Sequence, residues 1–365
     1  MMIDDFFGDL QTDIMIKKKN ARLWVLAAIA LTSLTLFGCG ISAKNAAPYD
    51  GKEYITISEL TEEGENPKEA AASLVVIHNY DSELSVPTYV TKVDDNWFIV
   101  DCYHNRVIYS KDMGAPLTDW NIMCSEATQP HTMASDGTVY MIEDTENNRV
   151  LIYEKIDEKF VKTQVIYDVG NRPHFTVYDK TSDTFYVWSS VTGELYCFRH
   201  TQDSPRVYLT EIRKIDQLAG LYVRSFTIID DDIYFVSGVS SDGAPGQILK
   251  CDLKTLTVEK SYPVPDDLAG MVQITPIGGM FYITVSTDLY GDQGFATIVR
   301  TKSLDDLSSG KYEDIYSKYF IGGGTPYNIS QVDDTYYLTE HRLKGHSIWS
   351  FKVKSKKITD VLSLY

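Results

Sequence analysis

The chain has 365 residues, 44% hydrophobic and 23% charged, which is typical of a folded globular protein and too apolar for a disordered one. Its 51 acidic residues outnumber 34 lysines and arginines, leaving a formal net charge of −17. Nucleic-acid-binding proteins need a basic face against the phosphate backbone, so we expect no nucleic-acid partner. The 25 tyrosines favour β-strands over helices.

The first forty residues have the pattern of an export signal. A basic cluster at 17–22 precedes an apolar run at 23–37, and Gly38 and Cys39 follow. A positive segment, an apolar segment and small residues are the three parts of a secretory signal. The apolar run is shorter than the about 20 residues that a membrane-spanning helix needs. Acidic residues precede the basic cluster and oppose such a signal, so we predict that 1–14 are a leader outside the true protein, which starts at Met15.

The cysteine after the apolar run indicates lipid anchoring. Leu36-Phe37-Gly38-Cys39 resembles the lipobox of bacterial lipoproteins, whose cysteine thiol receives a diacylglyceryl group and becomes the first residue. The resemblance implies a lipoprotein signal peptide over 15–38 and lipidation at Cys39. It also implies a position on the extracytoplasmic face of a bacterial cell membrane, held by acyl chains. An uncleaved N-terminal membrane anchor is the alternative, and it too exports the rest of the chain.

The next segment is predicted to be a tether. Residues 39–72 are polar and acidic, with a short strand-like piece at 54–58 and a helical turn at 67–72. From residue 73 onward, short runs of β-branched and aromatic residues alternate with Asp-Gly, Asp-Asp and Gly-Gly turns. No stripe of apolar residues at helical spacing appears there. We therefore expect one all-β domain over 73–365.

A sixfold repeat identifies the architecture. A turn followed by an aromatic strand recurs with anchors 42, 46, 48, 48 and 55 residues apart, at Phe98, Tyr140, Tyr186, Tyr234, Tyr282 and Tyr337. This spacing accommodates four short strands per repeat, as in a β-propeller blade. We predict six blades of four strands, with 314–320 as the outer strand of the fifth. Closure of the ring could use 358–365 or 72–78.

The first two repeats share a more specific motif. Asp101-x-x-x-Asn105-Arg106-Val107 recurs 43 residues later, beginning at Asp144. The motif resembles the NHL repeat, and the resemblance implies an NHL-like propeller. Asp and Asn side chains stabilise tight turns by bonding to the backbone, and the arginine can form an ion pair with the Asp. We therefore expect a structural role for these residues.

The first strand of each blade should line the central channel. Alignment on the proline before that strand gives one ring of equivalent residues: Thr88, His131, His174, Arg224, Val272 and Tyr327. The next positions give a second ring: Tyr89, Thr132, Phe175, Ser225, Gln273 and Asn328. A shift of one residue in register exchanges the two rings, so the sequence does not decide which faces the axis.

Three interpretations of these rings compete. In the first, His131, His174, Arg224 and Tyr327, with Tyr89, form a polar ligand-binding site, because arginine suits carboxylates and phosphates while tyrosine stacks and donates. In the second, the histidines simply bond to water and neighbouring carbonyls. The third arises from a resemblance to propeller lyases such as the peptidyl-amidoglycolate lyase, which implies a divalent metal on His131 and His174. Its third ligand would be His341, Glu340 or Asp101.

The predicted function follows from the binding interpretation. We expect a monomeric cell-surface lipoprotein whose propeller, without a cofactor, binds a glycan, a peptide or an envelope protein at the channel mouth. A metal-dependent lyase or hydrolase with an axial site on His131 and His174 is the alternative. The four cysteines after Cys39 match no metal-binding spacing. Cys102 with Cys124 is the one disulfide worth testing, and isolated buried thiols are the expectation.

Overall fold

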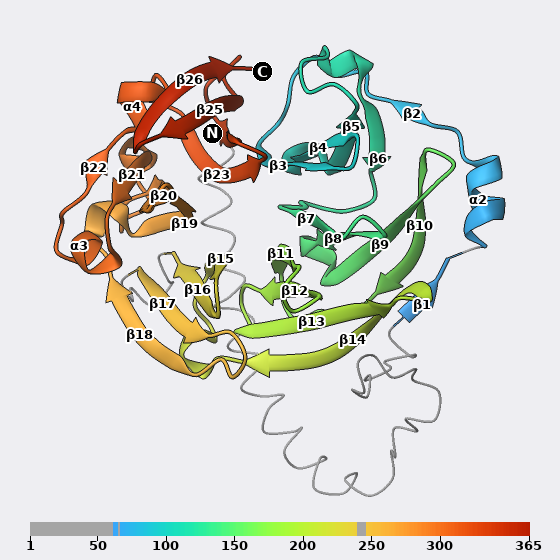
Figure 1. Cartoon of the computed structure of the whole chain (residues 1–365), viewed down its shortest axis with the longest axis horizontal. Coiled ribbons are helices and arrows are strands. Elements are labelled where there is room, and N and C mark those ends of the chain that lie inside the picture. The colour runs from blue at the N-terminus through green and yellow to red at the C-terminus, as the bar shows by residue number, and fades with distance from the viewer. Residues whose placement is uncertain (1–60, 65, 239–245) are drawn as a thin grey trace, which may run out of the picture. The chain divides into compact units, whose positions relative to one another are not determined.

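A ring of six β-sheets forms the body of the protein (Figure 1). The computed structural model describes residues 61–64, 66–238 and 246–365. In each blade four antiparallel strands follow one another in chain order. The predicted six-bladed propeller with four strands per blade is therefore confirmed. The proposed signal peptide, Cys39 and the strand-like piece at 54–58 lie outside the described residues.

The strands occupy the predicted segments in most blades. Blade 1 contains β3 (Pro87–Val93), β4 (Asn96–Asp101), β5 (Arg106–Ser110) and β6 (Asn121–Cys124). Blade 2 contains β7 (Met133–Ser135), β8 (Val139–Asp144), β9 (Arg149–Ile156) and β10 (Lys159–Ile166). Blade 3 contains β11 (Pro173–Asp179), β12 (Thr184–Ser189), β13 (Glu194–Thr201) and β14 (Ser204–Lys214).

The other three blades repeat this order. Blade 4 contains β15 (Val223–Ile229), β16 (Asp232–Ser237), β17 (Gln247–Asp252) and β18 (Val258–Pro263). Blade 5 contains β19 (Gly270–Ile277), β20 (Met280–Thr287), β21 (Thr297–Thr301) and β22 (Glu313–Asp314), and blade 6 contains β23 (Thr325–Val332), β24 (Thr335–His341), β25 (Ile348–Lys354) and β26 (Lys357–Ser363). The short helices of the described residues are α2 (Pro67–Ser73), α3 (Leu304–Ser308) and α4 (Tyr316–Tyr319), with 3₁₀ turns η2 (Cys102–His104), η3 (Leu117–Asp119), η4 (Thr145–Asn147), η5 (Asp216–Leu218), η6 (Asp266–Leu268) and η7 (Gln293–Phe295).

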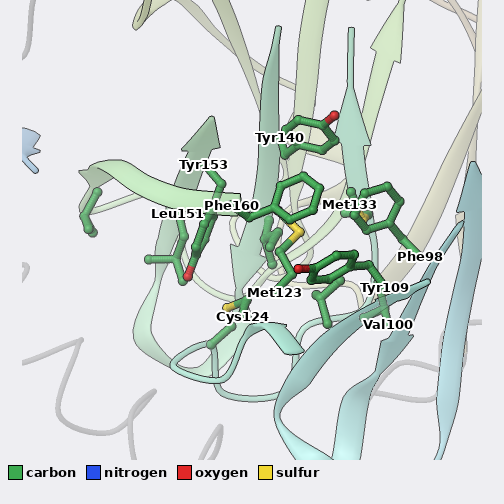
Figure 2. Close-up of a cluster of buried hydrophobic side chains, with 14 residues drawn as sticks. Phe98, Val100, Tyr109, Met123, Cys124, Met133, Tyr140, Leu151, Tyr153 and Phe160 are labelled. Carbon is green, nitrogen blue, oxygen red and sulfur yellow. The ribbon is translucent and has the colours of Figure 1, made fainter. Parts of the chain in front are cut away.

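The core consists of apolar layers between neighbouring blades. The six aromatic anchors of the repeat are all buried. Figure 2 shows the layer between blades 1 and 2, where Phe98 and Tyr140 pack edge to face against Phe160. Aromatic pairs of this geometry contribute beyond their buried area. The repeat is therefore visible in the sequence because each blade supplies an aromatic packing residue at the equivalent position.

The outer strand of blade 5 departs from the prediction. Only β22 is extended, and residues 316–319 form helix α4 in place of the expected strand over 314–320. Tyr316 and Phe320, four residues apart, are both buried, which is the helical spacing. The Asp314 carboxylate accepts a hydrogen bond of 3.0 Å from the Tyr316 amide and caps this turn.

The predicted tether contributes to the propeller. Strand β1 (Thr61–Glu63) pairs with β10 and adds a fifth strand to blade 2. The helical turn appears as α2, and β2 (Ile77–His78) pairs with β6 as a fifth strand of blade 1. Residues 61–64 and 66–72 are therefore part of the folded body in place of a free spacer. Strands β1 and β2 cover the edges of blades 2 and 1, which would otherwise be open.

No strand is shared between blades 6 and 1 among the described residues, since β26 completes blade 6 from its own segment. The two blades meet through side chains. The Ser330 hydroxyl donates to the Val90 carbonyl at 2.6 Å, and the Tyr365 hydroxyl donates to the Ala115 carbonyl at 2.7 Å. Of the two predicted sources of closure, 358–365 supplies the outer strand of blade 6, whereas residues 77 and 78 extend blade 1.

Two other expectations concern the cysteines and the membrane. All four described cysteines are buried and free, so the disulfide between Cys102 and Cys124 is absent and the thiols are isolated as expected. Within the described ranges, the helices are too short or too polar to cross a bilayer.

Candidate functional site

The first ring of predicted residues coincides with a repeated β-bulge. In five blades the pairing between the first and second strands skips one residue on the first strand, and that residue is Thr88, His174, Arg224, Val272 or Tyr327. In blade 2 the first strand begins only at Met133, so His131 precedes it. A bulged residue leaves the regular alternation of the strand and its side chain can turn in a new direction. The bulges therefore free this ring from packing between blades.

Side-chain contacts show that the ring converges on the channel. The Tyr327 hydroxyl lies 2.9 Å from His131 Nδ1, although blades 6 and 2 are not neighbours in the ring. The His131 and His174 rings stack at 3.8 Å between centroids, with 22° between their planes. Tyr327 stacks on His131 at 5.8 Å. Residues from three blades therefore form one cluster of rings where the first strands approach one another.

Arg224 extends this cluster from blade 4. It is 8% exposed, and its guanidinium donates to the Ser286 hydroxyl and, at 3.4 Å, to the Gly270 carbonyl. Its guanidinium carbon also lies 5.5 Å from the centroid of the Tyr222 ring. Both bonding partners are neutral, and no ion pair to Arg224 occurs among the described residues. A buried guanidinium with neutral partners is a candidate anion-binding group.

The two histidines are neutral at ordinary pH. Burial, with the charge of Arg172 second, lowers the pKa of His174 to about 3. Burial also holds the pKa of His131 well below its usual range, and the neighbouring His174 adds to the shift. His174 Nδ1 lies 2.8 Å from the Arg224 carbonyl, to which it donates, and its Nε2 accepts from the Tyr222 hydroxyl at 3.0 Å. His131 Nε2 is buried and has no hydrogen-bond partner among the described residues.

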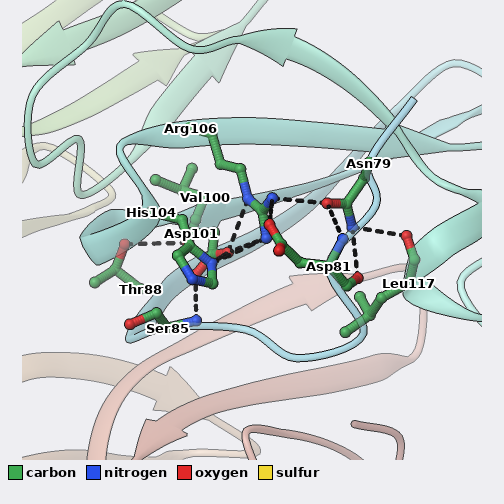
Figure 3. Close-up of polar contacts among 9 residues, drawn as sticks. All are labelled: Asn79, Asp81, Ser85, Thr88, Val100, Asp101, His104, Arg106 and Leu117. Carbon is green, nitrogen blue, oxygen red and sulfur yellow. Dashed lines mark hydrogen bonds and ion pairs between the residues drawn. The ribbon is translucent and has the colours of Figure 1, made fainter. Parts of the chain in front are cut away.

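The repeated Asp-x-x-x-Asn-Arg motif holds the segments that lead into this site. Figure 3 shows Asp101 accepting from the Ser85 amide at 2.7 Å and from Arg106 Nε and Nη2 at 3.0 and 2.8 Å. The Asn105 side chain accepts from the amide of Gln129, in the next blade, at 2.9 Å. The expected pairing of arginine with the motif aspartate is confirmed.

The motif explains the unusual backbone before two of the site residues. Gln129 and Arg172 precede the prolines of blades 2 and 3, and both have left-handed backbone angles, with φ of 53° and 60°. This conformation is uncommon for residues other than glycine. Asn105 bonds to the amide of Gln129, and Asn148 bonds to that of Arg172 at 2.8 Å. Each motif asparagine thus stabilises the segment that presents the histidine of the following blade.

Tyr89 does not join the cluster. It lies on the second ring and packs against the apolar layer between blades 1 and 2. It also lines a cavity of about 440 Å³ formed by residues of β3, β7 and β11, and neither histidine is among the residues that line it. The prediction that Tyr89 belongs to the same ligand site as His131 therefore fails, because a regular strand position turns toward the neighbouring blade.

Other members of the second ring connect blades. The Ser225 hydroxyl donates to the Val272 carbonyl at 2.6 Å, and Gln273 accepts from the Ile329 amide at 2.8 Å. Among the residues that the structure describes, no backbone ladder joins neighbouring blades, so these side chains connect them instead. The register question left open by the sequence is thus answered for four blades: His131, His174, Arg224 and Tyr327 of the first ring come together, whereas Ser225 and Gln273 of the second ring join neighbouring blades.

The geometry does not fit a metal shared by His131 and His174. A bound zinc ion lies about 2.0–2.1 Å from an imidazole nitrogen, near the plane of that ring. Rings stacked face to face at 3.8 Å direct their nitrogen lone pairs side by side and not toward one point. Across the described ranges, no three His, Cys, Asp or Glu side chains form a group suited to a metal.

The three proposed third ligands have other roles. Asp101 is bonded to Arg106, and Glu340 accepts from Trp349 Nε1 at 2.6 Å and from the Tyr316 hydroxyl. His341 ends β24, and burial together with Arg342 lowers its pKa to about 4.

Three residues of the cluster were not predicted from the sequence. Arg172, 9% exposed, forms an ion pair with Glu146 and influences the pKa of both ring histidines. Tyr222 contacts His174 and Arg224. Arg172 and Tyr222 directly precede the first strands of blades 3 and 4, so extending the alignment by one residue would have found them. The third, Glu143, lies beneath His131 and had no visible signal.

Comparisons with known proteins support the fold. No protein-family model and no curated protein matches the sequence. A solved structure described as a "putative 6-phosphogluconolactonase" from Bacteroides fragilis is 13% identical, with a TM-score of 0.53, covering 78% of this chain and 86% of that one. A second structure with this description, from Bacteroides uniformis, is 11% identical, with a TM-score of 0.53, covering 78% and 87%. At such low identity the likeness shows the propeller fold alone.

Proposed function

We propose that the propeller binds a small ligand carrying a carboxylate or phosphate group at the channel mouth. The group would belong to a free metabolite or to the end of a glycan or peptide. The observation that carries this proposal is the buried Arg224 guanidinium, whose hydrogen-bond partners, Ser286 and Gly270 of blade 5, are both neutral. A charge-assisted bond to an anion would compensate a buried cation that the described residues leave without an ionic partner.

The surrounding groups would select among anions. Neutral His131 offers an unpartnered Nε2, and Tyr327 and Tyr222 offer hydroxyls and ring faces. The cluster has no acidic side chain in contact with Arg224 among the described residues, so an anion would meet no direct repulsion. We expect ligands with hydroxyls beside the acidic group to bind better than simple anions, because more polar atoms of the site are then satisfied.

Mutation of Arg224 tests the site. We expect D-galacturonate or glucose 6-phosphate to bind and neutral galactose to bind far more weakly, as measured by isothermal titration calorimetry. Arg224→Met should weaken anion binding roughly 10- to 100-fold, the effect of losing a hydrogen bond to a charged group. Arg300→Met is the matched control, because Arg300 is paired with Glu313 on an outer strand. Equal affinities for wild type and Arg224→Met would contradict the proposal.

A hydrolase is the second candidate function, and it is tested by adding a possible substrate to the same set of probes. The two similar structures bear a lactonase description, and His131 Nε2 is buried without a hydrogen-bond partner among the described residues. A phosphosugar lactone therefore belongs among the probes. Turnover that is lost in His131→Gln would replace the binding proposal with a catalytic one.

We further propose that the protein is an exported lipoprotein with an NHL-like propeller. The support for export is the basic cluster, the apolar run and Cys39 in the sequence, and the support for the NHL likeness is the paired motif in blades 1 and 2. Acyl chains on Cys39 would attach the protein to the outer face of a bacterial cell membrane despite its acidity.

Lipidation at Cys39 can be measured directly. Expressed in a bacterium and labelled with an alkyne analogue of palmitate, the full chain should incorporate label and fractionate with membranes. Cys39→Ser should lose all label, whereas Cys124→Ser should retain it, because Cys124 is a buried thiol of the propeller. Equal labelling of Cys39→Ser and wild type would exclude this anchor.

A further inference from the structure

A buried carboxylate is hydrogen-bonded to the backbone at His131. Glu143, on β8, is fully buried, and its Oε1 accepts from the amide of His131 at 3.0 Å and from the amide of Thr132. The Thr132 hydroxyl donates to the same oxygen at 3.0 Å, and the Thr176 hydroxyl of blade 3 donates to Oε2 at 2.8 Å. Glu143 therefore receives hydrogen bonds from two blades.

These bonds replace a missing piece of β-ladder. In the other five blades the first strand pairs with the second at or beside the ring position, but β7 begins only at Met133. The amides of His131 and Thr132 consequently lack strand partners, and buried amides without partners are costly. The carboxylate of Glu143 accepts from both of them.

The same contacts set the position of the imidazole. His131 must lie where its ring can stack on His174 and its Nδ1 can reach the Tyr327 hydroxyl. In the part of the chain that the structure describes, regular strand pairing of this segment begins only at Met133, and a further bond here joins the Thr176 amide to the Thr132 side chain. Removal of the carboxylate would therefore release the backbone that carries the ring. We infer that Glu143 is a positioning residue that holds His131 in the ligand site through the amides of His131 and Thr132. As a statement about ligand binding, this inference rests on the proposed function.

Blade 6 offers a matched control. Glu340 also lies next to the last residue of a second strand and is equally buried. Its carboxylate bonds to Trp349 and Tyr316, both of blade 6 or the connection before it, and to no ring residue. Loss of either carboxylate should disturb packing, but only loss of Glu143 should disturb the histidine.

The experiment compares Glu143→Leu, Glu143→Gln and Glu340→Leu in the full-length protein with histidines labelled with ¹³C. The His131 ring resonance is assigned by its loss in His131→Gln. We expect Glu143→Leu to shift this resonance and to weaken galacturonate binding at least tenfold. Glu143→Gln, which keeps an acceptor oxygen, should restore the affinity to within about threefold of wild type, and Glu340→Leu should change neither quantity. An unchanged His131 resonance in Glu143→Leu would overturn the inference.

Two further outcomes remain decisive. If wild type binds none of the probes, the ligand proposal fails, whereas the His131 resonance still tests the positioning role. If Glu143→Leu does not fold, the inference is tested in Glu143→Gln by the chemical shifts of the amide protons of His131 and Thr132. Amides bonded to a carboxylate should move upfield when it becomes a carboxamide, and unchanged amide shifts would reject the inference.

Discussion

Asp101→Ala should destabilise the propeller by about 3–5 kcal/mol, the range for removing one member of a buried ion pair. Asp101 is fully buried, and its Oδ2 accepts two hydrogen bonds from Arg106, which is 5% exposed. The substitution leaves the guanidinium with Asn79 and the half-exposed Asp81 (Figure 3). It also removes the acceptor for the Ser85 amide before the first strand of blade 1. Urea denaturation measures the loss.

Asp81→Ala is the control for this prediction. Asp81 pairs with the same arginine, at 2.5 Å from its Nη1, but its side chain is 55% exposed. Exposed ion pairs contribute about 0–1 kcal/mol, so the midpoint should move little. Asp144→Ala should fall between the two, since Arg149 is more exposed than Arg106. Equal losses for Asp101→Ala and Asp81→Ala would show that burial of the pair does not govern its contribution.

The sequence predicted the blades because their signals are local. Alternating apolar residues, an aromatic anchor and an Asp or Gly turn all lie within one hairpin, and each is dictated by strand geometry. Residues 61–63 lacked such a signal, since an added edge strand is held by backbone bonds and can be polar. Glu63 of this strand forms an ion pair of 2.8 Å with Arg206, a residue of blade 3 that lies close to Glu63 only in the folded structure.

The candidate site was predicted in part for a similar reason. Alignment on the proline placed His131, His174, Arg224 and Tyr327 in one ring, and the structure brings them together. The bulge that separates this ring from Tyr89 depends on pairing between strands, so the sequence could not decide between the rings. Glu143 was missed because its partners lie 11 to 33 residues away along the chain.

Stability should depend on pH through two buried glutamates. Burial raises the pKa of Glu143 and of Glu340 from 4.5 to about 7, although hydrogen bonds partly oppose the shift. In the unfolded chain both carboxyls titrate near their ordinary value. Between pH 4.5 and 7 the folded state therefore holds more protons than the unfolded state, and the free energy of unfolding falls as pH rises. Each carboxyl should contribute a fall of about 3 kcal/mol across that window.

The ring histidines change the free energy of unfolding in the opposite direction, over a lower pH range. Their pKa values are depressed, so the unfolded state binds more protons below pH 6.5, and stability from these groups is lost on acidification. A single curve of stability against pH would therefore combine the two effects.

The contribution of one glutamate is isolated by the difference in unfolding free energy between wild type and Glu340→Gln, measured in urea at pH 5 and pH 8. Because the variant cannot titrate there, the stability of wild type relative to it should fall by about 3 kcal/mol at the higher pH. A constant difference would mean that Glu340 is ionised in the folded protein throughout.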